Sequence, residues 1–417
     1  MPKTLFILAG EASGDLHGAK LIEALKAADP GIRIVGMGGP KMAAAGLEVF
    51  KDLDGMQVVG FWEVAKKYGF FKKVFFELLD RFKQTKPDAL ICIDYPGFNL
   101  RFAKEVHKLG VPILYYIVPQ VWAWKPDRAR TMSTYIDRAY CVFDFEPPFF
   151  QKFANEPGAK MKTVFVGHPI LDQPKISEAP EIKLSRDAKI VSVLPGSRQS
   201  EIENHLEPAC FGIHRARKPG QPIHAIFSIS KGTPICRASQ AQIMTMTGEH
   251  WAFWRNVKTH WAFHPSNESQ VSICESEQKE ISEAVSIQGS HASLLPALSD
   301  FSVVKSGTST LEAGLQSNPM CVVYKGGWIS YGIARLLVDI PVFSLVNIVL
   351  GKYAVPELLQ SEVNPTRIAA EIERGLTDQK YIETQRAALA ELPKKLGGPG
   401  ASVRTAQAML GFLNGKE

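Results

Sequence analysis

Short apolar runs, each ending at a glycine or proline turn, alternate along this chain with longer segments of helical periodicity. The first half contains six such runs: TLFILAG, IRIVGMGG, ALICIDYPGF, PILYYIVP, RAYCVFDF and KTVFVGHP. Continuous apolar runs of this length are typical of strands in a parallel sheet that helices cover on both faces. The alternation therefore predicts a doubly wound α/β fold.

The chain has 417 residues, which is too long for one core of usual size. Residues 1–169 are predicted to form a first α/β domain, and the polar segment 170–187 a linker. A second series of strands predicts another α/β domain over residues 188–363. Helical periodicity marks residues 364–417 as C-terminal helices that pack back on the domains. Two such domains are expected to face each other across a cleft.

The interval 208–286 fits this scheme least well. It contains one predicted strand, HAIFSIS, but otherwise little periodicity and an unusual share of histidine and tryptophan. Divergence is one interpretation. A shifted reading frame in the gene is another, and it would leave the chain inactive; retranslation of the nucleotide sequence in the other frames tests it.

The overall charge is mildly basic, at +6. This value suits phosphate ligands or an anionic membrane surface but falls short of a nucleic-acid-binding signature. The six cysteines form no C-x-x-C pair, so a reducing cytoplasm is expected. The longest uncharged run, 109–124, is too short to span a bilayer and contains two prolines. A D-x-D triplet at Asp52 and Asp54 is expected to be solvated, and no metal or cofactor is predicted.

A glycine-rich turn, AGEASGDLHGA, follows the first predicted strand and leads into a helix. Its glycines allow the backbone to approach a ligand, and Ser13 or Asp15 is expected to cap the helix. His17 is either a polar site residue or an ordinary surface histidine of that helix. The turn lies at the carboxyl edge of the sheet, where open α/β sheets bind ligands.

Asp94 ends another predicted strand, ALICI, and precedes a proline turn. A carboxylate at this edge would be partly desolvated and could accept a proton from an attacking hydroxyl. A turn-forming aspartate is the alternative interpretation.

Two further turns predict a site for a phosphate-containing ligand. In LPGSRQSEI, Gly196, Ser197 and Arg198 bring backbone N–H groups, a helix N-terminus and a guanidinium together, which suits a diphosphate. In KSGTSTLEAG, a second turn opens a helix that carries Ser309, Thr310 and Glu312. Neither turn is a Walker loop.

The segment KKYGFFKKVFFELL, residues 66–79, is rich in both lysine and phenylalanine. Read as a helix, it has a core stripe that includes Val74, Leu78 and Phe82, while Phe70 and Phe76 fall outside that stripe. A membrane-facing patch is one interpretation, and lysine stems covering a core helix are the other. The residues of the candidate patch are Lys66, Lys67, Phe70, Phe71, Lys72, Lys73, Phe75 and Phe76.

Eight motifs together resemble the lipid-A-disaccharide synthase family, in the same order and over nearly the whole chain. They are GEASGDLHG, GMGGPKM, DYPGFN, PQVWAWK, VGHP, LPGSR, SGTSTLE and VPELLQ. The resemblance implies a two-domain glycosyltransferase fold of the GT-B type without a metal requirement. It also implies an inverting transfer from UDP-2,3-diacylglucosamine to 2,3-diacylglucosamine 1-phosphate, which yields a lipid A disaccharide and UDP.

The resemblance also implies roles for individual residues. Asp94 would be the general base, and Arg198 with the Gly196–Ser197 backbone would stabilise the departing diphosphate. The remaining residues would line the substrates: Ser13, Asp15 and His17 the acceptor, Ser309, Thr310 and Glu312 the nucleotide, and Asn347 and Glu357 the donor.

Acylated substrates imply a peripheral enzyme at the cytoplasmic face of the inner membrane, and the family suggests that a homodimer could form. Three alternatives remain open at this stage. Two are other UDP-sugar enzymes of the same fold, namely the peptidoglycan UDP-N-acetylglucosamine transferase and UDP-N-acetylglucosamine 2-epimerase. The third is a catalytically inactive protein that binds the membrane surface.

Overall fold

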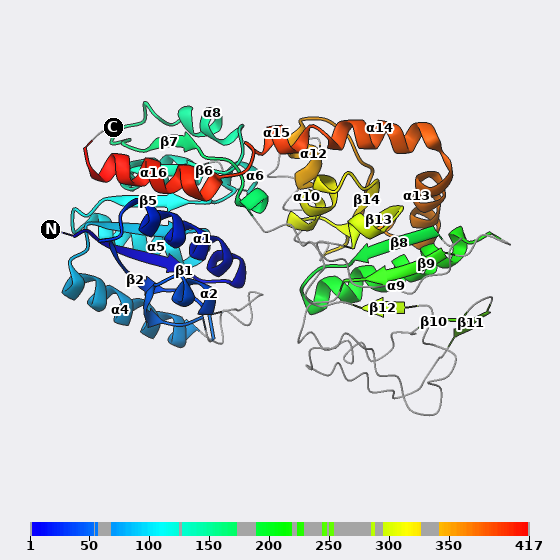
Figure 1. Ribbon diagram of the computed structural model, residues 1–417, viewed down its shortest axis with the longest axis horizontal. Helices are drawn as coiled ribbons and strands as arrows, with labels where there is room; N and C mark the ends of the chain where they lie inside the picture. Colours follow the sequence, from blue (N-terminus) through cyan, green and yellow to red (C-terminus); the bar gives the residue numbers. More distant parts are fainter. Residues whose placement is uncertain are drawn as a thin grey trace. The chain divides into compact units, whose positions relative to one another are not determined.

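The computed structural model of this chain describes residues 2–53, 55–56, 68–124, 127–172, 189–218, 223–228, 244–247, 250–253, 285–287, 295–326 and 342–415. The chain divides into two compact units. The first comprises Met1–Gln173 and Lys394–Glu417, and the second comprises Pro174–Pro393. Figure 1 shows that each unit is built of strands and surrounding helices.

The first unit contains a seven-stranded sheet in the order β3-β2-β1-β4-β5-β6-β7, and every neighbouring pair is parallel. The strands are β1 (Thr4–Ala9), β2 (Arg33–Met37), β3 (Glu48–Lys51), β4 (Ala89–Ile93), β5 (Ile113–Tyr116), β6 (Arg138–Cys141) and β7 (Lys162–Phe165). The central strand β4 is buried throughout, as a strand covered on both faces should be.

Helices connect these strands and cover the sheet. They are α1 (Ala12–Ala28), α2 (Pro40–Ala44), α4 (Tyr68–Thr85), α5 (Pro96–His107), α6 (Val121–Trp124), α7 (Asp127–Tyr135), α8 (Glu146–Gln151) and the 3-10 helix η1 (Pro169–Asp172). The predicted core stripe of α4 is confirmed, because Val74, Leu78 and Phe82 are buried in a cluster with side chains of β1, β4 and α5.

The last helix of the chain returns to the first unit. Helix α16 (Ala401–Leu413) lies beside α1 in Figure 1. The Asp172 carboxylate caps α16 by accepting hydrogen bonds from the N–H groups of Gly400 and Ser402, at 2.6 and 2.7 Å. The Arg138 guanidinium stacks over the Phe412 ring at 4.3 Å. Capping and stacking therefore fix both ends of α16.

The second unit contains a six-stranded sheet in the order β12-β9-β8-β13-β14-β15, again with parallel neighbours. A separate antiparallel pair joins β10 to β11. The strands are β8 (Lys189–Leu194), β9 (Ile223–Phe227), β10 (Met244–Thr247), β11 (His250–Phe253), β12 (Val285–Ile287), β13 (Phe301–Lys305), β14 (Met320–Tyr324) and β15 (Glu357–Leu359). The strand predicted at HAIFSIS is confirmed as β9.

The helices of the second unit are α9 (Gln199–Ala216), η4 (Pro296–Leu298), α10 (Thr308–Leu315), α12 (Leu345–Leu350), η5 (Gln360–Glu362), α13 (Pro365–Thr377) and α14 (Gln379–Leu389). Helix α15 (Leu392–Lys395) crosses the boundary between the units. Helix α13 packs against α9. The predicted block of C-terminal helices is therefore divided, since α13 and α14 belong to the second unit and α16 to the first.

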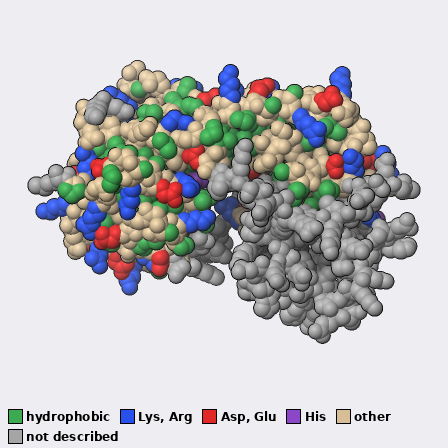
Figure 2. All heavy atoms as spheres, in the orientation of Figure 1, with side chains coloured by type: hydrophobic (Ala, Val, Ile, Leu, Met, Phe, Trp, Pro, Cys, Tyr) green, Lys and Arg blue, Asp and Glu red, His purple; other side chains and the backbone are tan. Residues whose placement is uncertain are grey.

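Two parallel-stranded sheets with connecting helices confirm the predicted α/β class. None of the helices in the described ranges is long and apolar enough to cross a bilayer. On the face of the first unit drawn in Figure 2, acidic and basic side chains are interspersed.

Candidate active site

In the first unit the strand order reverses between β1 and β4, and open α/β sheets bind ligands beside such a reversal. The turn after β1 runs through Gly10, and the turn after β4 runs through Asp94 and Tyr95. The Tyr95 ring lies so close to Gly10 that a Cβ atom at position 10 would come within 2.2 Å of it. Glycine at this position therefore allows the two turns to meet.

The turn that carries Asp94 has an unusual backbone. Asp94 and Tyr95 both lie in the left-handed region, with φ of 44° and 48°, where residues other than glycine are uncommon. The Asp94 carbonyl oxygen accepts hydrogen bonds from the Tyr115 hydroxyl, at 2.7 Å, and from the Asn99 amide, at 2.8 Å. These bonds hold a conformation that is typical of functional sites.

The environment of Asp94 makes its carboxylate more basic than usual. Burial, assisted by the nearby Glu11 carboxylate, raises the pKa of Asp94 to about 6, while a hydrogen bond with the Tyr95 backbone opposes the shift. A carboxylate with this pKa is ionised at pH 7 yet accepts a proton more readily than an exposed aspartate does. Asp94 therefore has the protonation behaviour of a general base.

Asp15 supports the loop after β2 rather than its own helix. Its carboxylate is 3% exposed and accepts three hydrogen bonds from backbone N–H groups at the start of α2, at 2.9, 3.1 and 2.9 Å. The N-cap of α1 is Glu11, and its side chain makes no capping hydrogen bond. The prediction that Ser13 or Asp15 caps α1 is therefore wrong. Ser13 is exposed on the first turn of α1.

Two histidines come together near the start of α16. Burial lowers the pKa of His17 to about 4, and the Asp172 carboxylate only partly opposes this. His168 follows β7 and is 8% exposed; burial and then His17 lower its pKa to about 3. His168 Nδ1 accepts a hydrogen bond from Ile170 N at 3.1 Å. Both imidazoles are therefore neutral at pH 7. The sequence motif VGHP contains His168, but the motif alone indicated no role for it.

A buried glutamate positions the tryptophan of the PQVWAWK motif. Glu146 is fully buried; its Oε1 accepts a hydrogen bond from Trp122 Nε1 at 3.1 Å, and its Oε2 accepts one from Val142 N at 2.9 Å. Burial raises the pKa of Glu146 to about 7, and these hydrogen bonds oppose the rise. The Trp122 ring also packs edge-on against Phe145, at 5.0 Å. No sequence pattern pointed to Glu146, because an isolated glutamate near a turn is usually exposed.

In the second unit the strand order reverses between β8 and β13. The turn after β8 passes through Gly196, with φ of 119°, into α9. The Glu201 carboxylate folds back over this turn, and a Cβ atom at position 196 would come within 2.4 Å of its Oε2. Glu201 Oε2 accepts hydrogen bonds from Ser197 N at 3.1 Å and Arg198 N at 3.4 Å. The N–H groups predicted to receive a diphosphate are thus engaged by a carboxylate of the chain.

Two cations accompany this carboxylate. Lys305 Nζ lies 2.8 Å from Glu201 Oε1, and the half-exposed Arg198 guanidinium lies 3.4 Å from the same oxygen. Burial alone would raise the pKa of Glu201. The hydrogen bond and positive charge of Lys305, together with the charge of Arg198, outweigh burial, so the pKa of Glu201 lies below its usual value. In this structure the two cations bind a carboxylate oxygen of the chain itself, and the diphosphate site at this turn stays a prediction.

Helix α10 begins at the matching turn after β13. Thr310 is buried and its hydroxyl donates to the Gly307 carbonyl oxygen at 2.8 Å, so this hydroxyl serves the helix itself. Ser309 is partly exposed. Glu312 is also partly exposed, and burial raises its pKa.

Asn347 and Glu357 lie side by side, with Asn347 Nδ2 donating to Glu357 Oε1 at 2.8 Å. Glu357 also accepts hydrogen bonds from Phe343 N and from the Ser344 hydroxyl, at 2.8 and 2.6 Å. The Asn347 side chain bonds both backbone groups of Val355. The pair predicted to line the donor therefore fixes the backbone around α12.

The candidate membrane patch divides into buried and exposed residues. Phe75 packs against Phe98 and Phe102 of α5, at 5.5 and 5.4 Å, while Phe76 is 50% exposed. Phe70 and Phe71 pack against the core cluster, and Lys72 and Lys73 are exposed. Lys66 and Lys67 lie outside the described residues.

No cluster of three or more histidine, cysteine, aspartate or glutamate side chains suited to a metal ion occurs among the described residues.

Comparisons with known proteins give a consistent result. The profile of the family described as Lipid-A-disaccharide synthetase matches residues 5–250 and 254–411, which include most of the interval 208–286. The chain is 35% identical over 413 residues to the lipid-A-disaccharide synthase of Anaeromyxobacter dehalogenans, covering 98% of this chain and 97% of the relative. The chain is also 36% identical over 417 residues to the lipid-A-disaccharide synthase of Syntrophus aciditrophicus, and the match covers 99% of this chain and 98% of the relative.

Solved structures with low sequence identity share the fold. S. aureus MnaA with UDP superposes with a TM-score of 0.62 at 12% identity, covering 99% of this chain and 97% of that one. The calicheamicin glycosyltransferase CalG4 superposes with a TM-score of 0.56 at 14% identity, and the match covers 98% of each chain. These similarities show that the fold is the GT-B type.

Proposed function

This chain belongs to the lipid-A-disaccharide synthase family, and from that premise we propose the reaction that it catalyses and the residues that carry it. It is a glycosyltransferase of lipid A biosynthesis. The proposed donor is UDP-2,3-diacylglucosamine, and the proposed acceptor is 2,3-diacylglucosamine 1-phosphate. The products are the β-1,6-linked, tetraacylated disaccharide 1-phosphate and UDP.

The observation that carries the proposed mechanism is the environment of Asp94. Its carboxylate accepts the proton of the acceptor 6-hydroxyl while that oxygen attacks the anomeric carbon of the donor. The bond from this carbon to the UDP oxygen breaks as the new bond forms, so the configuration inverts. The pKa of about 6 supports this role, because a base of this strength is free to act at neutral pH and holds the proton more firmly than an exposed aspartate.

Arg198 stabilises the negative charge that develops on the diphosphate as it leaves. Lys305 lies beside the same carboxylate and adds a second positive charge. The diphosphate displaces the Glu201 carboxylate from the N–H groups of Ser197 and Arg198, and it gains their hydrogen bonds. Ser309 and Glu312 bind the nucleoside at the start of α10, and Thr310 lies beside it with its hydroxyl bonded to the Gly307 carbonyl oxygen. Asn347 with Glu357 shapes the donor side.

The acceptor binds to the first unit beside β1 and β4. Ser13 and His17 lie on α1 next to this edge, and a neutral imidazole at position 17 serves as a hydrogen-bonding group. Asp15 acts on the acceptor side by positioning α2, since its oxygens are already bonded to that helix.

The enzyme works at the cytoplasmic face of the inner membrane, where both lipid substrates reside. Phe76 enters the acyl region, and Lys72 and Lys73 meet anionic headgroups. The exposure of these three side chains on α4 supports this placement. A homodimer is compatible with the family.

The choice of donor tests this function. The purified chain is incubated with 2,3-diacylglucosamine 1-phosphate and either UDP-2,3-diacylglucosamine or UDP-N-acetylglucosamine, and UDP release is measured. We expect release with the acylated donor and little with the other. Turnover of UDP-N-acetylglucosamine alone would instead indicate an epimerase, and UDP binding without release would indicate an inactive binding protein.

A further inference from the structure

A cavity of about 620 Å³ lies in the second unit, beside the carboxyl ends of β14 and β15. Lys325 and Gly326, which follow β14, line one side of it. The remaining lining includes Gln360, which follows β15, and Asn204 of α9. None of these residues belongs to the phosphate-binding turns described above. The carboxyl edge of a parallel sheet is where α/β proteins bind ligands.

Gln360 has two unusual properties for a lining residue. It is 4% exposed, and its backbone is in the left-handed region with φ of 51°. Its side-chain oxygen accepts a hydrogen bond from Gly326 N at 3.3 Å, but its Nε2 group has no hydrogen-bond partner in the described structure. A buried amide donor without a partner is rare in proteins and commonly marks a place where a ligand or water completes the bond.

Lys325 adds a positive charge to the same cavity. Its side chain is exposed, and its ammonium group forms no ion pair with the described residues. Its backbone is held in place, because Lys325 N donates a hydrogen bond to His205 Nε2 at 2.8 Å. The nearby Glu362 carboxylate is paired with Arg367 at 3.6 Å, so it is partly neutralised.

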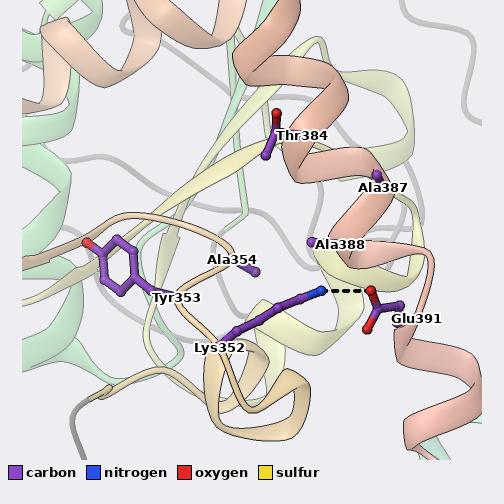
Figure 3. Close-up of a pocket in the computed structure, with 7 residues that line it drawn as sticks. All are labelled: Lys352, Tyr353, Ala354, Thr384, Ala387, Ala388 and Glu391. Carbon is purple, nitrogen blue, oxygen red and sulfur yellow. Dashed lines mark hydrogen bonds and ion pairs between the residues drawn. The ribbon is translucent and has the colours of Figure 1, made fainter.

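A second cavity, also in the second unit, is lined differently, as Figure 3 shows. It measures about 420 Å³, and its lysine, Lys352, is paired with Glu391 at 2.7 Å. The hydroxyl of Tyr353 in that cavity accepts a hydrogen bond from Glu357 N at 2.9 Å. Its cation is therefore already neutralised by the protein, which makes Lys352 a suitable control.

We propose that the cavity between Lys325 and Gln360 is an anion subsite that binds a phosphate group. The Lys325 ammonium neutralises the charge, and Gln360 Nε2 donates a hydrogen bond to one phosphate oxygen. The phosphate belongs either to the UDP-sugar donor or to a separate molecule, such as a lipid headgroup or free phosphate. The subsite does not depend on the proposed transfer reaction, because phosphate binding is measured without turnover.

Two substitutions separate ligand binding from support of the fold. Gln360→Glu retains an oxygen for the Gly326 N–H group but removes the unpaired donor and adds a negative charge. Lys325→Gln removes the charge from an exposed position that the fold does not need. Lys352→Gln is the control.

The test is a titration of the full chain, carrying isotope-labelled glutamine, with inorganic phosphate. The side-chain amide signal of Gln360 is identified by its loss in Gln360→Glu. We expect that signal to move and saturate with phosphate, and Lys325→Gln to weaken this binding about tenfold. In Lys352→Gln the titration should match the unmodified protein. A Gln360 signal that does not respond to phosphate, or an equal response in Lys325→Gln, would overturn the proposal.

Addition of UDP then distinguishes the two sources of the phosphate group. If UDP shifts the Gln360 signal and prevents the response to phosphate, the subsite receives the diphosphate of the donor. If phosphate still produces the same shift when UDP is bound, the subsite receives a separate phosphate group. A failure of the transferase assay would leave either result unaffected.

Discussion

Asp94 combines a strained backbone, partial burial and a nearby carboxylate, and all three features cost stability. Because the pKa of Asp94 is raised to about 6 in the folded protein, folding favours the protonated carboxyl group. The folded protein is therefore less stable with Asp94 ionised, as catalysis needs it, than with Asp94 protonated. Such a conflict between stability and activity is common at catalytic residues.

Asp94→Asn should consequently stabilise the protein at neutral and alkaline pH. At about pH 8 we expect the free energy of unfolding in urea to increase by about 1–3 kcal/mol. The gain should shrink as the pH falls from about 6 towards 4, where the carboxyl group becomes protonated in both states. Equal or lower stability of the variant at about pH 8 would contradict the environment described for Asp94.

The pH dependence of turnover provides a second test at the residue scale. Since the base must be ionised, kcat/KM should rise with pH and level off above the pKa of about 6. Initial rates with saturating donor give the profile, and the affinity for UDP over the same range is the control. A profile that stays flat down to about pH 4.5 would exclude Asp94 as the titrating base.

Glu201 occupies the position proposed for the diphosphate. Glu201→Gln removes the competing charge, so we expect UDP to bind about three- to tenfold more tightly, as judged by calorimetry. Glu203→Gln, an exposed change on the same helix, is the matched control and should alter affinity by less than about twofold. Weaker UDP binding in Glu201→Gln would show that the carboxylate supports the turn instead of competing with the ligand.

At the scale of elements, the docking of α16 depends on a capping residue far away in the sequence. Asp172 accepts hydrogen bonds from three backbone N–H groups at the start of α16. Asp172→Ala should therefore lower the free energy of unfolding by about 1–2 kcal/mol in urea denaturation. Asp378→Ala, which removes one capping bond from α14, is the control and should cost less. An unchanged stability in Asp172→Ala would show that packing alone holds α16.

The elements that sequence reasoning predicted are those with continuous apolar runs. Strands β1, β2, β4 to β9, β13 and β14 all coincide with such runs. Strand β3 was missed because its side chains are largely exposed, and β12 and β15 because each has only three residues. Strands β10 and β11 were missed because their segment has no continuous apolar run. Periodicity needs several buried residues in a row, so an exposed strand such as β3, or a short strand such as β15, gives no recognisable pattern even though Leu358 of β15 is buried.

The sequence predicted the location of the candidate site residues well. It did not predict the hydrogen bonds that these residues make. Asp94 and Gly196 follow predicted strands, so their placement at the carboxyl edge could be inferred from strand order. The bonds of Asp15 to α2 and of Glu201 to the Gly196 turn depend on loop conformations that no local pattern encodes. Burial of Glu146 was equally hidden, since its partner Trp122 lies on another element.

At the scale of the whole molecule, the proposed membrane surface depends on one exposed aromatic side chain more than on the others. Phe76→Ser should weaken binding to vesicles that contain anionic phospholipid by about fivefold to tenfold, as measured by co-sedimentation. Leu109→Ser is the matched control, because Leu109 is 45% exposed at a different place in the first unit. Equal losses in both variants would mean that α4 is not the membrane-binding surface.

The most direct test of the mechanism compares the unmodified chain with Asp94→Asn. Each is incubated with UDP-2,3-diacylglucosamine and 2,3-diacylglucosamine 1-phosphate, and the tetraacylated disaccharide is quantified by mass spectrometry. We expect the unmodified chain to form the disaccharide, and Asp94→Asn to form it at least about a hundredfold more slowly while binding UDP equally well. Equal rates of disaccharide formation by the two proteins would contradict the assignment of Asp94 as the general base.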